Sequence, residues 1–455
     1  MRYHLLGIGG TAMAHLAVLL RDIDHDVTGS DQGVYSPMRE LLEEEGIPFA
    51  DVYDPVNLGS PDLVVVGNAI SRGNEELEEV LARRIPFRSQ AEVLKELFLE
   101  NRRTAVVAGT HGKTTCSALL AWLLQDLDPG FLVGGIPLDF RCGAQVGHGE
   151  PFVVEGDEYD TAFFDKGPKF LHYRPWLVLL NDVEYDHADI YKDLDSYLLA
   201  FERLVNVIPA NGRLVMYAHG AGVGRIRSKA RCEVISFGTS AGDHSPLDVC
   251  VEPNGMRSFA ISRVPGRFRT WLIGMHNIVN STGCILAAHE YGVPFDRLAE
   301  LLPMFAGVHR RQELLVKCAG GLLVYDDFAH HPTAIAATLR ALRESLPGRR
   351  IWAVFEPRSW SMRMKVFQEK MPEAFQDADR VIIGPVFQSS RVAAALDPAA
   401  VASAIAQTGR EAAYIPDIDE IARAIASSAG ANDAVVILSN GAFGGLAIKL
   451  KELLA

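Results

Sequence analysis

Cysteine is scarce in this chain, with six cysteines in 455 residues. None of them forms a CxxC pair, and no group of histidines accompanies them at the spacing of a zinc site. A chain of this size does not need the disulfide framework that small secreted domains use. We therefore expect free thiols in a reducing cytosol. The six are Cys116, Cys142, Cys232, Cys250, Cys284 and Cys318.

A basic excess is also missing. Lys plus Arg number 44 and Asp plus Glu number 57, which gives a net charge of −13. Proteins that bind nucleic acid or anionic membranes in general carry the opposite balance. We therefore expect neither a nucleic-acid nor a membrane partner, although a local pocket of lysine or arginine can still bind an anionic ligand.

Long apolar runs are absent as well. The nearest candidate is the segment 3–20, but three glycines and His15 interrupt it, and no small-x-small cleavage site precedes Arg21. No other segment approaches the roughly 18 apolar residues of a membrane span. Apolar residues make up 48% and charged residues 22%, which excludes a disordered or fibrous chain. We expect a soluble, cytoplasmic, globular protein.

What the chain does have is a repeated pattern of strand, glycine turn and helix. Its length corresponds to about three domains at roughly 150 residues each. Strands that alternate with helices predict parallel, doubly wound sheets, and hence an α/β protein. We place the domains at 1–103, 104–307 and 308–455, with Rossmann-like folds in the first and third. The stretch 211–271, rich in Gly, Ser and short strand-like runs, predicts a β-rich insertion. Predicted strands are 3–6, 63–66, 104–108, 152–154, 176–180, 322–325, 351–355, 380–383 and 434–438.

A glycine turn follows the first predicted strand. Gly7, Gly9 and Gly10 suit a diphosphate that lies over a turn at a helix start, near Thr11. A GxGxxA pattern alone is weak, and a nicotinamide cofactor is its commonest interpretation. Asp31, at the end of the next strand, fits either the ribose of such a cofactor or a uridine nucleotide. The turn therefore predicts a bound nucleotide without deciding which one.

The strongest local signal is GTHGKTT, between a buried-type strand and an apolar helix at 118–124. The glycines let backbone N–H groups turn toward phosphate oxygens, and the helix N-terminus adds partial positive charge. Lys113 can reach the β- and γ-phosphates of ATP, and the Thr114 hydroxyl can bind Mg²⁺. Val107 stands where the common P-loop has glycine, so this loop is a shorter variant. A second nucleotide-binding loop in the chain argues against a dehydrogenase. The expected ATP contacts are Gly109, Thr110, His111, Gly112, Lys113, Thr114 and Thr115.

Acidic side chains follow two later strands. The segment 155–160 reads EGDEYD, and the segment 181–189 reads NDVEYDHAD. Because the carboxyl ends of parallel strands meet at one edge of a sheet, both segments are expected beside the P-loop. Carboxylates and an imidazole there suit Mg²⁺, or Mn²⁺, bound to phosphate.

These motifs, in this order over nearly the whole chain, resemble the Mur ligases of bacterial cell-wall synthesis. GIGGTAM near the N-terminus and the HHPT segment look most like the branch that adds L-alanine to UDP-N-acetylmuramate. Other details are more similar to the branch that joins UDP-N-acetylmuramate to the murein tripeptide L-Ala-γ-D-Glu-meso-diaminopimelate, with ATP, in peptidoglycan recycling. The L-alanine branch remains the alternative within the family, and a P-loop ATPase or binding module without ligation is the alternative outside it. The details are VTGSD (27–31), GNA (67–69), FFDK (163–166), EPRS (356–359) and SNGAFGG (439–445), beside GMHN (274–277) and DDFAHHPT (326–333).

The resemblance implies roles residue by residue. Lys113 and Thr114 would hold the phosphates and the first Mg²⁺, with Glu155 in the shell of that ion. His187 would bind a second Mg²⁺ between the γ-phosphate and the carboxylate of the sugar. Lys113, Glu155 and His187 are thus the predicted catalytic residues. The other predicted ATP contacts are His276 and Asn277 to adenine, Arg311 to phosphate and Asp327 to ribose. Predicted substrate contacts are Gly7, Gly9, Gly10, Thr11, Asp31, Asn68, Ala69, His331, Arg358 and Ser359.

Two departures from the family pattern concern details of the site. Several relatives carry a carbamylated lysine further along the chain than the metal histidine, and Glu202 lies at the corresponding place. Glu202 either supplies that negative group or is a solvent-facing helix residue. Trp360-Ser361 stands where we would expect Asn-Thr, which concerns peptide recognition. The candidate cations for the carboxylates of the peptide are Arg310, Arg311, Arg358, Arg363 and Lys365, while His330 and His331 remain open to helix-cap or packing roles.

Overall fold

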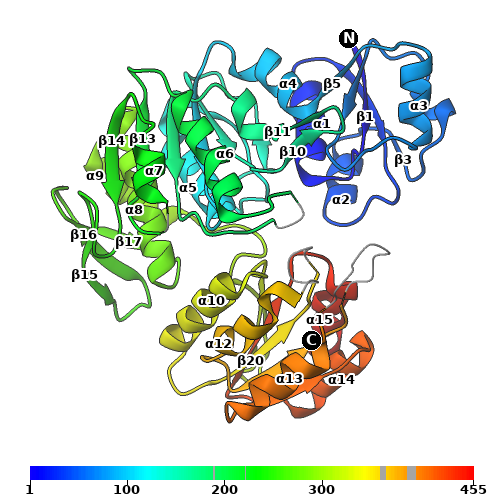
Figure 1. The fold of residues 1–455 in the computed structure, drawn as a ribbon. Coiled ribbons are helices and arrows are strands. Elements are labelled where there is room, and N and C mark those ends of the chain that lie inside the picture. Colours follow the sequence, from blue (N-terminus) through cyan, green and yellow to red (C-terminus); the bar gives the residue numbers. More distant parts are fainter. Residues whose placement is uncertain (188–189, 221, 359–364, 387–395, 455) are drawn as a thin grey trace.

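The computed structural model describes residues 1–187, 190–220, 222–358, 365–386 and 396–454. Three mainly parallel sheets, each flanked by helices, follow one another along the chain (Figure 1). With their helices we call them the N-terminal, central and C-terminal units. The N-terminal unit (blue) and the central unit (cyan to green) lie side by side, and the C-terminal unit (yellow to red) lies against them from below in this view. The predicted α/β class with parallel sheets is confirmed.

The N-terminal unit has the strand order of a Rossmann fold, β3-β2-β1-β4-β5, and every neighbouring pair is parallel. The direction of winding changes between β1 and β4, so the turn after β1 opens at this switch point. Helix α1 is buried along almost its whole length because it packs between this sheet and the central unit. The elements are β1 (Arg2–Leu6), α1 (Thr11–Asp22), β2 (Asp26–Ser30), α2 (Met38–Glu44), β3 (Phe49–Ala50), β4 (Leu63–Val66), α3 (Glu75–Ala82), β5 (Phe87–Ser89) and α4 (Gln90–Leu94).

The central unit holds a seven-stranded sheet in the order β14-β13-β12-β6-β9-β7-β8, parallel except for the last pair. Its middle strands are short, fully buried apolar runs, as expected for a parallel sheet covered on both faces. A small hairpin, β10 and β11, follows β9. The elements are β6 (Arg103–Ala108), α5 (Lys113–Leu123), β7 (Gly130–Leu132), β8 (Ala144–Gln145), β9 (Pro151–Glu155), β10 (Asp160–Ala162), β11 (Asp165–Pro168), β12 (Leu177–Leu180), α6 (Leu194–Asn206), β13 (Arg213–Tyr217), α7 (Val223–Arg227), β14 (Glu233–Phe237), α8 (Met275–Glu290) and α9 (Phe295–Leu301).

The stretch 211–271 is a β-rich insertion only in its second half, which corrects the prediction. Strands β13 and β14 pair in parallel with β12 and extend the central sheet. Only β15 (Pro246–Val251), β16 (Arg257–Ile261) and β17 (Phe268–Thr270) form a separate antiparallel sheet. Short strands of both kinds have similar composition, so the sequence did not separate them.

The C-terminal unit has a six-stranded sheet in the order β18-β19-β23-β20-β21-β22, parallel except for β18 with β19. The carboxyl ends of β19, β20 and β23 face the central unit. The elements are β18 (Glu313–Lys317), β19 (Leu323–Asp327), α10 (Pro332–Ser345), β20 (Arg350–Phe355), α12 (Met371–Ala374), β21 (Arg380–Ile383), α13 (Pro398–Gln407), β22 (Glu411–Tyr414), α14 (Ile418–Ser428), β23 (Asp433–Leu438) and α15 (Leu446–Leu454).

One hydrophobic core runs through both the N-terminal and the central units. It joins apolar side chains of α1 and β1 to those of β9 and α6. His15 of α1 lies in this contact with no exposed surface, where its Nδ1 is 3.0 Å from the Val133 carbonyl oxygen and its Nε2 accepts from the Gly143 N–H at 3.2 Å. The C-terminal unit has its own two cores, one on each face of its sheet.

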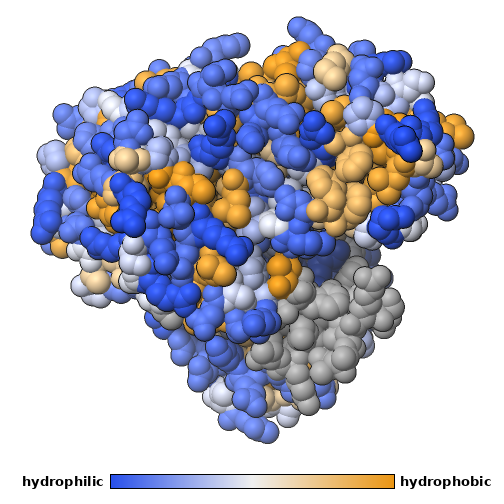
Figure 2. All heavy atoms as spheres, turned by 45° about the horizontal axis from the view of Figure 1, so that its top comes forward, coloured by the Kyte–Doolittle hydropathy of each residue, from blue (hydrophilic) through white to orange (hydrophobic). Residues whose placement is uncertain are grey.

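The face shown in Figure 2 is mostly hydrophilic, with hydrophobic residues in small groups. Of the helices in the described ranges, none combines the length and the apolar character needed to cross a bilayer. The six cysteines are all free.

Candidate active site

The P-loop connects the end of β6 to the start of α5. Gly109 and Gly112 have φ values of 128° and 77°, which favour glycine. A Cβ at Gly112 would also come within 2.9 Å of the Asn181 and Asn280 side chains, so no larger residue fits. Helix α5 begins at Lys113, and its N-terminus therefore opens toward the loop, which is the arrangement that binds phosphate.

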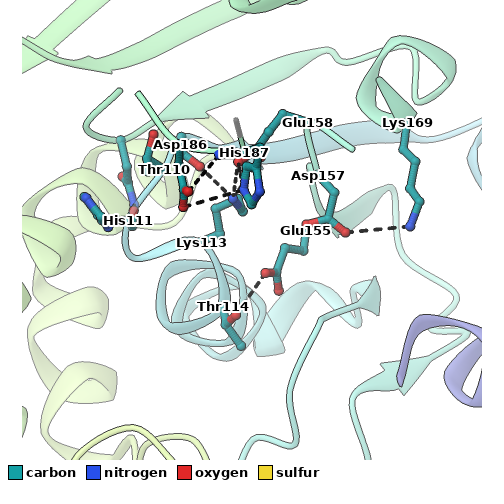
Figure 3. A network of polar contacts seen from close by, with 12 residues as sticks. Thr110, His111, Lys113, Thr114, Glu155, Asp157, Glu158, Lys169, Asp186 and His187 are labelled. Carbon is teal, nitrogen blue, oxygen red and sulfur yellow. Dashed lines mark hydrogen bonds and ion pairs between the residues drawn. The ribbon is translucent and has the colours of Figure 1, made fainter. Parts of the chain in front are cut away.

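Lys113 is tied to a buried carboxylate. Its Nζ lies 2.8 Å from the Gly109 carbonyl oxygen and 2.9 Å from Glu158 Oε2 (Figure 3). Burial would raise the pKa of Glu158, but Lys113 and His187 lower it to about 2. Burial likewise opposes the charge of Lys113, yet Glu158 and Asp157 raise its pKa above the usual value. Both groups are therefore charged at neutral pH.

Thr114 links the central and C-terminal units. Its hydroxyl donates to Glu155 Oε1 at 2.9 Å and accepts from the guanidinium of Arg311 at 2.9 Å. Glu155 Oε2 accepts from the Gly134 N–H at 2.7 Å. Burial and the nearby Asp157 raise the pKa of Glu155. The Thr114 hydroxyl and the Glu155 carboxylate therefore lie together at the start of α5, and a positive charge added there would stabilise the ionised carboxylate.

His187 closes the other side of this cluster. Its Nε2 lies 3.1 Å from Glu158 Oε1 and 3.8 Å from Asp186 Oδ2. Its φ of 55° is unusual for a residue with a Cβ and fixes the direction of the imidazole. The ring of Tyr159 packs edge-on against it at 4.6 Å. Figure 3 shows Lys113, Glu158 and His187 pointing toward one another from three segments.

The donor set fits a divalent cation bound to phosphate. Mg²⁺ prefers oxygen ligands and is usually held by one or two carboxylates together with phosphate oxygens. Thr114 with Glu155 offers one such set, and the imidazole and carboxylates around His187 offer a second. Burial and the nearby Asp157 disfavour the negative charge of Glu155 and so raise its pKa. A cation bound beside Glu155 would stabilise that charge.

A cavity of about 560 Å³ extends from this cluster between the three units. Its far end is formed by His276 and Asn277 at the start of α8. The Gln312 side chain contacts both: its Oε1 accepts from the Asn277 side-chain amide at 3.1 Å, and its Nε2 lies 3.4 Å from His276 Nε2. Burial, and then the charge of His111, lower the pKa of His276 to about 4, so its imidazole is neutral at pH 7. The cavity is also lined by Thr11, Thr115, Arg311, Asp327 and Phe328.

Asp327 lies at the end of β19 and is buried. Its Oδ2 accepts from the Gln312 N–H at 2.7 Å, and its Oδ1 accepts from the Ala329 N–H at 2.8 Å. Beside it, Arg311 stacks its guanidinium on the ring of Phe328 at 4.6 Å. Asp327 thus fixes the segment that carries Arg311 toward the P-loop.

Glu184 is a second contact between the central and C-terminal units. Its Oε2 lies 3.1 Å from His111 Nε2 and accepts from the Thr333 hydroxyl at 2.7 Å. His331 Nδ1 is 3.8 Å from the same oxygen and accepts from the Thr333 N–H at 3.3 Å. His331 therefore caps α10. In the described ranges, His111, Glu184 and His331 are the one group of three residues whose ligand atoms are all close enough for a single metal ion.

In the N-terminal unit, Asp31 closes the glycine turn. Its Oδ2 accepts from the Gly9 N–H at 2.9 Å, and its Oδ1 accepts from the Tyr53 hydroxyl at 3.0 Å. A Cβ at Gly9 would lie 2.9 Å from the Asp31 carboxylate, which explains the glycine. The exposed Asn68 and Ala69 follow β4, next to the end of β1. The remaining predicted residues of this unit are Gly7, whose φ is 86°, Gly10, which caps α1, and Thr11.

Arg358 lies just beyond the carboxyl end of β20, an inner strand of the C-terminal sheet. Its guanidinium lies 3.5 Å from Glu356 Oε1, and a Cβ at Gly441 would collide with it. Glu356 is buried and accepts from the Ser439 hydroxyl, while Arg310 donates to the Ser439 and Gly441 carbonyl oxygens at 2.7 Å. Ser359, Trp360, Ser361 and Arg363 lie outside the described residues, and the side chain of Lys365 does too.

Glu202 does not face the cluster. Its buried carboxylate pairs with Arg225 and with Lys229 on and beside α7. Glu202 is therefore neither at the His187 side of the cavity nor solvent-facing. The sequence reasoning missed Glu158, Glu184 and Gln312 as parts of the site, although Glu158 and Glu184 lie within the acidic segments that it singled out.

The chain is similar to known proteins over most of its length. Residues 2–102 match the description "Mur ligase family, catalytic domain", residues 107–288 "Mur ligase middle domain", and residues 310–441 "Mur ligase, glutamate ligase domain". The Escherichia coli UDP-N-acetylmuramate–L-alanyl-γ-D-glutamyl-meso-2,6-diaminoheptandioate ligase is 38% identical, over 100% of this chain and 98% of its own. The UDP-N-acetylmuramate–L-alanine ligase of Desulfitobacterium hafniense is 34% identical, over 97% of both chains.

A solved structure supports the same assignment. The murein peptide ligase of Psychrobacter arcticus is 34% identical and superposes with a TM-score of 0.76, over 100% of this chain and 98% of that one. A nucleotide-binding α/β enzyme of the ligase class is thus defined by both the fold and the relatives. The chain belongs to the Mur ligase family of ATP-dependent ligases.

Proposed function

We propose that this chain joins UDP-N-acetylmuramate to the murein tripeptide L-Ala-γ-D-Glu-meso-diaminopimelate with ATP. One observation carries the proposal: a single cavity is lined by the P-loop, by Glu155 and His187 of the central unit, and by Arg311 of the C-terminal unit. Relatives named for the tripeptide reaction, at 38% and 36% identity, support it over the L-alanine reaction, named for a relative at 34%.

The reaction needs an activated carboxylate, because an amine does not displace oxide from a free acid at neutral pH. Transfer of the γ-phosphoryl group of ATP to the carboxylate of the sugar gives an acyl phosphate, from which the amine of the peptide expels phosphate. Lys113 and the backbone N–H groups of the P-loop would stabilise the charge on the transferred group. Arg311 would bind it from the opposite side.

Mg²⁺ is part of the proposal. Thr114 and Glu155 would hold one ion, and His187 would hold a second. Such ions neutralise charge on phosphate oxygens and orient the two reacting groups. Water must stay out of the cavity, because it would hydrolyse the acyl phosphate. The contacts of Glu184 with His111 and Thr333 would keep the C-terminal unit over the cavity while the amine attacks.

The substrates would divide between the units. We propose that residues 1–103 bind UDP-N-acetylmuramate over the glycine turn, that 104–307 bind ATP and that 308–455 bind the peptide. Asn68, Ala69 and Asp31 stand at the strand ends of the first region, and Thr11 faces the shared cavity. Arg358 and His331 are the proposed contacts for the peptide in the third region, together with Ser359. Asn277, His276 and Asp327 would surround the nucleoside of ATP.

The test is the mass of the product. ATP, Mg²⁺ and UDP-N-acetylmuramate are mixed with the enzyme and either the tripeptide or L-alanine, and the product is identified by mass spectrometry. We expect a product of the mass of the sugar nucleotide plus the tripeptide minus water, and phosphate release only with all three substrates present. A strong preference for L-alanine would assign the other reaction, and phosphate release without an amine acceptor would indicate an ATPase.

A further inference from the structure

Glu158 is buried among the residues of the proposed second metal site, yet the family roles leave it without a function. Its side chain has no exposed surface. It follows β9 in the segment that also carries Glu155, and the Tyr191 hydroxyl donates to its backbone carbonyl at 2.7 Å. A second hydroxyl, that of Tyr197, donates to its Oε1 at 3.1 Å. The carboxylate is therefore held in one position from several sides.

The distance between Glu158 and His187 is that of two ligands on one ion. Glu158 Oε1 lies 3.1 Å from His187 Nε2. Adjacent ligands of an octahedral Mg²⁺, at about 2.0–2.1 Å from the ion, are about 3 Å apart. A cation can replace the Nε2 proton between these two atoms without moving either of them. The other oxygen, Oε2, remains 2.9 Å from Lys113 Nζ and keeps that ion pair.

The charges around Glu158 favour an added cation. Glu155, Glu158 and Asp186 are all at least nine-tenths buried on this side of the cavity. Lys113 contacts Glu158, and Arg311 reaches Glu155 through Thr114, so two fixed cations and the His187 imidazole face three carboxylates. Buried charges are costly unless they are paired or bound to a metal ion, so a divalent cation is the natural partner here.

We propose that the Glu158 carboxylate is a ligand of the second divalent cation, beside the His187 imidazole. In this role it provides the negative group that the sequence led us to consider for Glu202, whose carboxylate is instead paired with Arg225 and Lys229. The same carboxylate also pairs with Lys113. Lys113, which is proposed to bind phosphate, and His187, which is proposed to bind the ion, would therefore both contact Glu158. The inference rests on the proposed use of ATP with divalent cations.

A purely structural role for Glu158 makes a different prediction. If it only positions Lys113, its loss weakens nucleotide binding and leaves the metal sites intact. The two roles are separated by counting metal ions directly, because the count does not depend on turnover.

The experiment is a Mn²⁺ titration followed by electron paramagnetic resonance. The full chain is saturated with the non-hydrolysable β,γ-imido analogue of ATP, and free Mn²⁺ is measured at each addition. We expect two bound Mn²⁺ per wild-type chain, and at least a tenfold weaker second site in Glu158→Gln, the scale on which lost support of a metal ligand acts. His187→Ala should weaken the same site, and the double variant should add little to either single one.

The matched control is Glu202→Gln, which removes one buried negative charge from the same unit, but this carboxylate pairs with Arg225 and Lys229 instead of His187. It should keep both Mn²⁺ sites at wild-type affinity. Glu158→Asp keeps the negative charge but withdraws the carboxylate by one methylene, and it should also weaken the second site. This variant serves if Glu158→Gln does not fold, as judged by circular dichroism.

Two wild-type Mn²⁺ affinities in both Glu158 variants, at saturating nucleotide, would overturn the proposal. An equal loss of the second site in Glu202→Gln would do so as well, because the loss of any buried carboxylate of the central unit would then explain the effect. A wild-type chain that binds two Mn²⁺ in the expected manner but forms no ligation product would refute the proposed function and leave this inference standing.

Discussion

The guanidinium of Arg311, from the C-terminal unit, donates to the hydroxyl of Thr114 at the start of the P-loop helix at 2.9 Å. The same hydroxyl donates to Glu155. A residue far along the chain therefore reaches the proposed phosphate and metal site through a single side chain. Its stacking on Phe328 and the hydrogen bonds around Asp327 hold it there.

A substitution of Arg311 tests whether its side chain acts at the proposed phosphate site. Arg311→Lys keeps the charge but loses the planar fork of donors, and we expect kcat to fall about 100-fold, as for the loss of one donor to a transition state. The KM for UDP-N-acetylmuramate should stay within about threefold, because the sugar nucleotide is proposed to bind elsewhere. Steady-state kinetics with each substrate varied in turn give both numbers. An unchanged kcat would remove Arg311 from the proposed phosphate site.

Variants of Lys113 and Glu158 should affect the free energy of unfolding and the turnover differently. Lys113→Met leaves the Glu158 carboxylate buried without its lysine, and we expect a loss of about 3 kcal/mol in the free energy of unfolding. Adding Glu158→Gln removes that uncompensated charge and should restore most of the stability. Turnover should fall at least about 100-fold in the single variant and stay low in the double one. Chemical denaturation and product assays on the same preparations measure the two effects.

His187→Ala should lower turnover at least about 100-fold with little loss of stability, because the imidazole is predicted to act on a metal ion and not to hold the core. Wild-type turnover in this variant would argue against the assigned site. Removal of divalent cations with a chelator should stop wild-type turnover, and added Mg²⁺ or Mn²⁺ should restore it.

Stability should depend on pH through His15. Burial lowers its pKa to about 4 in the folded chain, while the hydrogen bond to Val133 opposes this only in part. The unfolded chain, with a histidine pKa of about 6.5, binds more protons between those values. The contribution is therefore present above about pH 6.5 and is lost as the pH falls toward 4, by up to about 3 kcal/mol. His15→Gln should show a smaller fall in the free energy of unfolding between pH 7 and 5 than the wild type, and equal slopes would contradict the role of His15.

Arg358→Ala should raise the KM for the tripeptide about tenfold or more, since the guanidinium is proposed to bind a carboxylate of the peptide. The KM for ATP should not change. Arg340→Ala is the control, because Arg340 belongs to the same unit and pairs with Asp377 at the surface. Equal KM values for the tripeptide in the two variants would exclude Arg358 from the peptide site.

The sequence was sufficient for the fold where strands are short, apolar and followed by glycine or acidic residues. The predicted strands 63–66 and 380–383 coincide with β4 and β21, and 104–108 lies within β6. Such segments are typical of the buried strands of a parallel sheet. The stretch 211–271 failed because the pairing partner of a strand, and not its composition, decides which sheet it joins.

For the site, the sequence indicated the segments but not the contacts within them. Lys113, Thr114, Glu155 and His187 were predicted, and the structure brings them together at one end of the cavity. Glu158 was not singled out, because one acidic residue among several in a loop is more often solvated. Its burial against Lys113 depends on how α5 and β9 pack. Glu202 was considered from its distance along the chain, and its pairing with Arg225 depends on the position of α7.

The continuous core through the N-terminal and central units has a mechanical consequence. A sliding motion between them would expose apolar surface along α1, whereas the C-terminal unit has its own cores and contacts the central unit through hydrogen bonds such as those of Arg311 and Thr333, beside the apolar Ile273. We therefore expect the N-terminal and central units to move as one body and the C-terminal unit to move relative to them, although each unit has its own main sheet. The proposed site of the sugar nucleotide would then keep its shape while the cavity opens and closes.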